Sequence, residues 1–287
     1  MIKDLLVILH QSFKKRLFVK LRFFIYLIGL LLCCSCEFRL RPVEEEAEDV
    51  PFIRIERYDR LESRYLTTGD FSALQQMSTE YPMETRALIE DILKLGQVND
   101  PEINTRFLNF YQDSILQTLI SDAEAQYADM DDLNKEFSDA FGRIKLWFPN
   151  MKIPMIYAQI TALDQSIVVS ESSIGISLDK YLGENYPLYV RFYTPEQRAT
   201  MKREHILPDC LTFLRISQYH LPNFDTREQI ERDYHIGKIH WVVNKILGRQ
   251  VYRTDIIDQI ERYMQKHSDV SYDDLLRDND FSKFLKK

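Results

Sequence analysis

Apolar residues recur every three or four positions between residues 131 and 149, which is the spacing of one face of an α-helix. The stripe consists of Leu133, Phe137, Ala140, Phe141, Ile144, Trp147 and Phe148. Pro149 follows and predicts that the helix ends there. A similar stripe near the C-terminus consists of Ile256, Ile257, Ile260, Tyr263 and Met264. The chain is therefore expected to be mainly helical.

Shorter patterns predict further helices. Two capping-box patterns, Thr194–Gln197 and Thr226–Gln229, mark helix starts, and the chain is expected to be helical from Thr194 to its end. One more helix is indicated by residues that fall at helical spacing before position 120, namely Leu108, Tyr111, Ile115, Leu116 and Leu119.

Between these regions the pattern becomes typical of strands, with apolar, β-branched or alternating segments at 153–160, 166–169 and 173–178. We expect a small antiparallel sheet near residues 153–178. Gly175 has no side chain, which predicts that a neighbouring group approaches the strand closely there. Phe52–Tyr58 alternates apolar and charged residues and predicts one more short, half-buried strand.

Residues 1–36 have the layout of a lipoprotein export signal. Basic residues between Lys14 and Arg22 precede an apolar run that ends near Leu32. The uncharged stretch is shorter than the about 20 residues that a membrane-spanning helix needs. Ser35 is the small residue expected before the cleavage site, and Cys36 supplies the thiol for the lipid. We predict that residues 1–35 are removed and that Cys36 carries the acyl chains.

The remaining chain is predicted to be an acidic tether, residues 36–50, followed by a single α+β domain, residues 51–287. The tether is charged and lacks any hydrophobic period. The domain contains no repeat and no linker, and the composition, 45% hydrophobic, is that of a globular protein. Cys210 is its one cysteine, so a disulfide framework is excluded and Cys210 is expected to be a packing residue.

Charge narrows the range of partners. The chain has a formal net charge of −7, and removal of the basic signal would make it more acidic. Such a surface repels phosphate backbones, so nucleic acid is not an expected partner. Contact with a membrane is expected through the lipid anchor at Cys36.

One central stretch is distinctive, Ile174–Gly183, and it follows Trp147–Pro149 and Ile153–Pro154. Together with Leu207–Asp209 and Gly237–Trp241, these segments resemble the gliding-motility lipoprotein B (GldB) family. The resemblance implies a lipid-anchored envelope protein of Bacteroidota, at the outer membrane, tied in some species to gliding and protein export. It also implies a distant relation to predicted zinc-dependent proteases, and so a degenerate zincin-like fold.

Zincins hold their metal with two histidines four residues apart on one helix, in the motif H-E-x-x-H. In this chain, Asp209 and Phe213 stand roughly where those ligands would be, and Phe213 has no donor atom. His235 and His240 are five apart, so they point to different faces of a helix. We therefore predict no catalytic residues, no metal ligands and no cofactor.

Other candidate features have simpler explanations. The acidic run Asp129–Asn134 lacks the glycine of a calcium loop and is interpreted as a helix N-terminus. Glu171 is interpreted as a solvated turn residue. The aromatic segment Tyr186–Tyr193 has two interpretations, a contact surface or a cap over the core, and the sequence favours neither.

The function predicted from these features is a non-catalytic envelope lipoprotein that acts through contacts with other envelope proteins. One alternative is an envelope hydrolase, similar to metallopeptidases, with a divergent site. A second alternative is a purely structural envelope factor.

Overall fold

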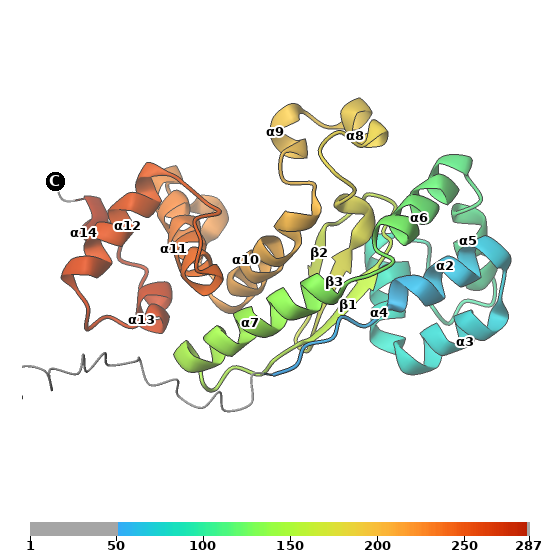
Figure 1. Cartoon of the computed structure of the whole chain (residues 1–287), viewed down its shortest axis with the longest axis horizontal. Helices are drawn as coiled ribbons and strands as arrows, with labels where there is room; N and C mark the ends of the chain where they lie inside the picture. Colours follow the sequence, from blue (N-terminus) through green and yellow to red (C-terminus); the bar gives the residue numbers. More distant parts are fainter. Residues whose placement is uncertain (1–50, 286–287) are drawn as a thin grey trace, which may run out of the picture. The chain divides into compact units, whose positions relative to one another are not determined.

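The computed structural model describes residues 51–285, which form one compact unit. The predicted signal, the tether and Cys36 lie outside the described residues. The described chain is mainly helical, with a small sheet in its middle (Figure 1). The predicted α+β class is confirmed.

The first half of the described chain is a succession of helices on the β1 side of the sheet (Figure 1). Their bounds are α2 Tyr58–Thr68, α3 Phe71–Glu80, α4 Pro82–Arg86, the π-helical η1 Ala87–Ile92, α5 Ile103–Phe110 and α6 Ser114–Gln126. α2 packs against α3, α6 and β1. The pattern at 108–119 predicted one helix, but the structure has two, because Asp113 caps a new helix by accepting a bond from the amide of Ile115.

The long predicted helix is α7, Asp131–Trp147. The apolar stripe faces the core as predicted, and Leu133, Phe137, Ala140, Phe141 and Ile144 are all buried. The acidic run before it lies at the start of this helix, with Asp131 and Asp132 in the first turn, as the helix N-terminus interpretation predicted.

The sheet has three strands, β1 Met155–Gln159, β2 Ile167–Val169 and β3 Ser173–Ser177, in the order β1-β3-β2. The strands lie where the sequence predicted them, but their pairing is mixed rather than antiparallel. β2 and β3 form an antiparallel pair, whereas β1 pairs parallel with β3, with Met155 opposite Ser173. The segment Phe52–Tyr58 alternates in burial as predicted, yet only Glu56 joins the sheet, through an isolated bridge to Tyr157.

Helices make up the rest of the described chain, and the largest, α10 and α11, pack against each other. The bounds are η2 Leu178–Lys180, α8 Pro187–Phe192, α9 Pro195–Arg198, η3 Arg203–His205, α10 Ile206–Gln218, η4 Phe224–Thr226, α11 Gln229–Leu247, α12 Asp255–Lys266, α13 Tyr272–Arg277 and α14 Ser282–Leu285. The capping box at Thr194 is present. The one predicted at Thr226 is not, because Thr226 ends a 3₁₀ turn and its hydroxyl bonds to Asn223.

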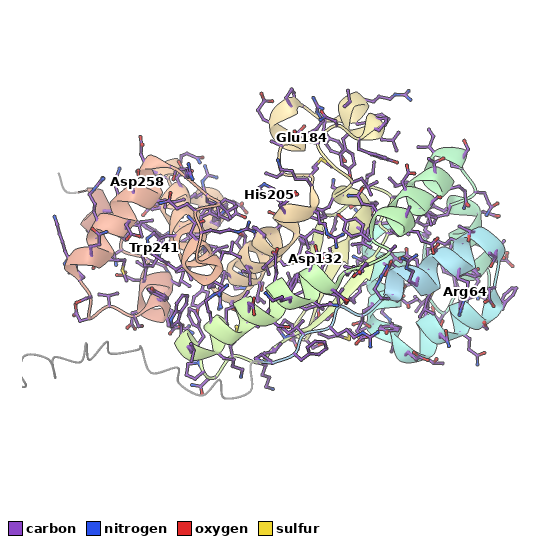
Figure 2. All side chains as sticks on the ribbon, in the orientation of Figure 1. Arg64, Asp132, Glu184, His205, Trp241 and Asp258 are labelled. Atoms are coloured by element: carbon purple, nitrogen blue, oxygen red, sulfur yellow. The ribbon has the colours of Figure 1, made fainter. Side chains whose placement is uncertain are left out.

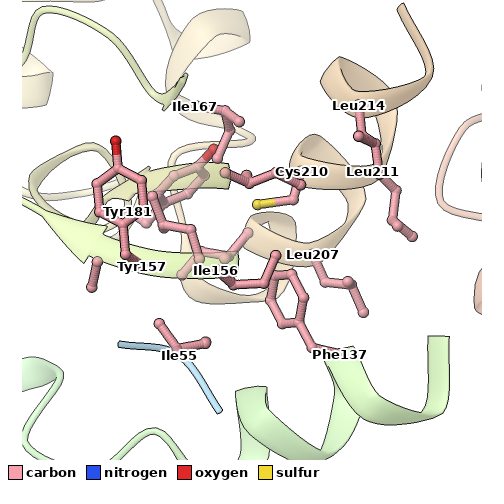
Figure 3. Close-up of a cluster of buried hydrophobic side chains, with 14 of the residues drawn as sticks. Ile55, Phe137, Ile156, Tyr157, Ile167, Tyr181, Leu207, Cys210, Leu211 and Leu214 are labelled. Carbon is pink, nitrogen blue, oxygen red and sulfur yellow. The ribbon is translucent and has the colours of Figure 1, made fainter. Parts of the chain in front are cut away.

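The core lies between the sheet, α7 and α10 (Figure 3). Cys210 on α10 is fully buried there beside Ile156 and Ile167, in agreement with its expected packing role. The predicted close approach at Gly175 is also present. A Cβ at this position would lie 2.6 Å from the ring of Tyr157, so the aromatic ring occupies the space that any larger residue needs.

Candidate functional site

Two buried carboxyls meet at the edge of the sheet where β1 and β3 end. Because these strands are parallel, their carboxyl ends share one edge, which in open α/β sheets is where ligands bind. Asp179 follows β3 directly, and α2 carries Glu62 to the same edge. Both side chains are fully buried.

Hydrogen bonds tie this carboxyl pair, Glu62 and Asp179, to the loop that leaves β1. Glu62 accepts from the amide of Ile160 at 2.8 Å. Asp179 accepts from the amides of Thr161 at 3.0 Å and Leu163 at 2.6 Å. Leu163 has φ of 66°, a left-handed conformation that costs energy in a residue other than glycine. Asp179 therefore stabilises a strained loop.

Burial dominates the electrostatics of the carboxyl pair. It raises the pKa of Glu62 well above its usual value, against the bond from Ile160, and the charge of Asp179 adds to the rise. It raises the pKa of Asp179 to about 6, against the two amide bonds. Burial thus favours the neutral form of Glu62, whereas Asp179 is mostly ionised at neutral pH. Neither carboxyl reaches solvent, and both are bonded to the loop that leaves β1, so the pair anchors this loop.

A further carboxylate, Asp209, is partly buried in the first turn of α10. The hydroxyl of Tyr181 donates to one of its oxygens at 2.9 Å, and the hydroxyl of Tyr252 lies 3.5 Å from the other. Tyr252 also bonds Thr212 at 3.0 Å. The ring of His240 on α11 stacks on Tyr252, with 3.8 Å between the ring centroids. Asp209 is therefore capped by two tyrosines that join α10 to the sheet and to α11.

The titrating groups around Asp209 are tuned mainly by burial. Burial raises the pKa of Asp209 to about 6, against the bonds from Tyr181 and Tyr252. It lowers the pKa of His240 to about 4, so this imidazole is neutral at pH 7. The pKa of the adjacent Cys210 thiol is also raised by burial. A thiol of that kind is a poor nucleophile, because the thiolate is the reactive form.

The residues on α10 do not fit a catalytic zinc. Both oxygens of Asp209 face tyrosine hydroxyls, and Phe213, four residues later, has no donor atom and is 42% exposed. Within residues 51–285, no three His, Cys, Asp or Glu side chains gather closely enough to hold a metal ion. A zinc protease site needs three protein ligands.

The three histidines His205, His235 and His240 lie in separate surroundings. His205 lies just before α10 (Figure 2) and is half-buried. On α11, His235 faces the ring of Phe224 at 6.5 Å, whereas His240 faces Tyr252, so the two point to different neighbours as their spacing predicted.

The aromatic segment Tyr186–Tyr193 caps the core in part, and its role as a contact surface stays a prediction. Tyr189 is fully buried and donates to the carbonyl of Asp179, so it caps the core. Val190 and Phe192, by contrast, are 53% and 60% exposed on α8. α8 extends away from the end of the sheet (Figure 1). Glu171 lies in an exposed bend, in line with its interpretation as a turn residue.

Sequence reasoning did not identify the buried charged residues. Glu62 carried a usable signal, because it is four residues from Tyr58 and from Leu66, on the buried face of α2. Arg215 carried a usable signal, because it is four residues from Leu211 and eight from Leu207, on the apolar face of α10. A charged residue on such a face is expected to have a partner or a function.

Comparison with known families gives one result. A family model described as gliding motility protein GldB matches residues 41–257. No curated protein and no solved structure matches the chain.

The raised pKa of Asp209 leads to a prediction about how the stability of the fold depends on pH. Between about pH 4 and pH 6, the folded chain holds a proton on Asp209 that the unfolded chain has released, so this residue destabilises the fold as the pH rises. Asp209→Asn cannot titrate. Between pH 4 and pH 7, the unfolding free energy of the parent chain should therefore fall by about 2–3 kcal/mol more than that of this variant.

Urea unfolding at several pH values measures this difference. The exposed Asp225→Asn variant is the matched control and should follow the parent chain. If the unfolding free energy of Asp209→Asn has the same pH dependence as that of the parent chain, Asp209 does not titrate with the raised pKa described above.

Proposed function

This chain belongs to the gliding motility protein GldB family, and from that premise we propose that it acts without catalysis, through contacts with other envelope proteins. Members of this family are envelope lipoproteins related to gliding motility, which sets the location of the protein. No helix within residues 51–285 is long and apolar enough to cross a membrane. We propose that acyl chains on Cys36 attach the protein to the membrane.

The observation that supports a non-catalytic role is the capping of Asp209. A zinc protease would present metal ligands from the inner face of the helix that packs on the sheet. In α10, the corresponding carboxylate is bonded to Tyr181 and approached by Tyr252, and the residue four positions on is a solvent-facing phenylalanine. Such packing favours a fixed connection between elements over an open reaction site.

The observation that favours a contact role is the exposed apolar surface of α8. Val190 and Phe192 leave most of their surface in water, although the tyrosines around them are tied to the core. Tyr186 donates to Asp122 at 2.8 Å, and Lys180 donates to Tyr193 at 3.1 Å. α8 is therefore held firmly by its tyrosines while it presents two apolar side chains, as an interface does.

Lipid attachment is tested by replacing one cysteine. Cys36→Ser removes the thiol that accepts the acyl chains, so the protein should lose labelling by radioactive palmitate and move to the aqueous phase in detergent partitioning. Cys34→Ser, two residues away, should keep both properties. Palmitate labelling of Cys36→Ser would show that the lipid is elsewhere.

The contact surface is tested by cross-linking in native membranes. We expect the parent chain to form discrete adducts with other envelope proteins, and Val190→Ser with Phe192→Ser to reduce their yield at least about fivefold, because the apolar core of an interface dominates its affinity. Phe71→Ser on α3 is the matched control, since Phe71 is 73% exposed away from α8. Persistence of all adducts in the α8 variant, or their absence from the parent chain, would contradict the proposal.

A further inference from the structure

A cavity of about 480 Å³ lies where the ends of α7 and α10 meet α13. Trp147 and Phe148 form an aromatic wall, and the ring of Trp147 contacts Tyr272 of α13 edge-on, with 4.7 Å between centroids. Asn150 and Arg277 lie at its exposed rim. The volume is in the range of small-molecule sites, about 300–1,000 Å³. The cavity is separate from Asp209 and from α8.

The most unusual group in this cavity is Arg215, which is only 1% exposed. One terminal nitrogen, Nη1, donates to Gln218 at 2.9 Å, and the guanidinium lies 4.2 Å from the ring centroid of Phe148. Its Nε and Nη2 have no hydrogen-bond partner in the described part of the chain. Burial lowers the pKa of Arg215 to about 10, so it remains charged at neutral pH. Unpaired buried charged donors are costly.

Nε and Nη2 form the edge of a guanidinium that grips a carboxylate with two parallel bonds. The chain uses this edge twice elsewhere. Arg57 donates from Nε and Nη2 to both oxygens of Asp59 at 2.9 and 2.8 Å, and Arg203 does the same to Asp132 at 2.9 and 2.5 Å. In Arg215 the same edge has no partner, which indicates that a carboxylate would complete it.

The one neighbouring carboxylate in the cavity compensates Arg215 only in part. The carboxylate of Asp273, which also lines the cavity, accepts from Tyr219 at 2.6 Å and from Arg277 at 2.7 Å. The cavity thus holds two guanidinium groups and one carboxylate, a single net positive charge in a chain whose formal net charge is −7. This balance matches a singly charged anion better than a phosphate dianion, which Asp273 would repel.

We propose that this cavity binds a carboxylate carried on an apolar group, with the Nε and Nη2 edge of Arg215 as its anchor. The aromatic wall of Trp147 and Phe148 would cover the apolar part, and the amides of Asn150 and Gln218 would bond a neighbouring peptide group. Both donors of Arg215 are covered in the described conformation, so the side chains beside them must shift to admit the ligand. Peptide chain ends and free aliphatic acids share this chemistry.

The two tryptophans of the chain allow a direct test. Trp147 lines this cavity, whereas Trp241 lies on α11 beside another cavity (Figure 2). In the full chain, purified in detergent and labelled with 5-fluorotryptophan, each gives one fluorine NMR signal, and Trp241→Phe assigns them. The probes are N-acetyl-leucine, its uncharged amide, 4-methylpentanoate and inorganic phosphate.

N-acetyl-leucine should shift the Trp147 signal in a saturable titration and shift the Trp241 signal less, because Trp241 contacts Tyr272 but does not line this cavity. The amide should bind at least about tenfold more weakly, because it lacks the charge that Arg215 pairs with. Tighter binding of N-acetyl-leucine than of 4-methylpentanoate assigns the site to peptide chain ends, and equal binding assigns it to aliphatic acids. Saturable binding of phosphate without binding of either carboxylate would overturn the proposal.

Variants separate a binding role from a structural one. Arg215→Lys keeps the charge but loses the two-donor edge, and it should weaken N-acetyl-leucine binding at least about tenfold. Arg215→Met should abolish binding and keep or raise the melting temperature, because it removes an unpaired buried charge. Arg203→Met, whose edge is already bonded to Asp132, should bind normally. Binding by Arg215→Met at the level of the parent chain would refute the site. So would a lower melting temperature of Arg215→Met if the parent chain shows no response to the ligand.

Discussion

The structure depends on burying the central strand β3 on both of its faces. All five residues of Ser173–Ser177 are buried, although the sheet has only three strands and cannot enclose them alone. α10 covers β2 and β3, and α2 packs on β1. Small residues on one face of β3 let the ring of Tyr157 lie against Gly175. The placement of α2 and α10 therefore follows from the need to cover this short sheet.

Close burial also explains why polar groups in this core are tied to tyrosines and backbone amides. A buried charge without a partner costs several kcal/mol, so each carboxyl needs donors. Asp179 has two backbone amides, and Asp209 has the hydroxyl of Tyr181 with that of Tyr252 nearby. These bonds hold a strained loop and join α10 to its neighbours. One oxygen of Glu62 and two donors of Arg215 have no hydrogen-bond partner in the described chain. Those of Arg215 belong to a side chain that lines a cavity, which favours binding over packing.

Local features could be predicted from the sequence, whereas features that depend on distant partners could not. α7, α12, the strands and the Thr194 capping box each follow from periodicity or capping within one segment. The parallel pairing of Met155 with Ser173 could not be predicted, because β2 intervenes in the chain and local pattern does not fix pairing. The hydrogen bond from the amide of Ile160 to Glu62 could not be predicted either, because 98 residues separate the two positions.

The central claim is that α10 joins elements of a binding protein and does not hold a catalytic metal. The most direct measurement is elemental analysis of the full chain, produced in zinc-containing medium and purified without chelator, combined with an assay of peptide hydrolysis. We expect zinc far below one ion per chain and no peptide hydrolysis. Near-stoichiometric zinc, together with hydrolysis that a chelator abolishes, would contradict it.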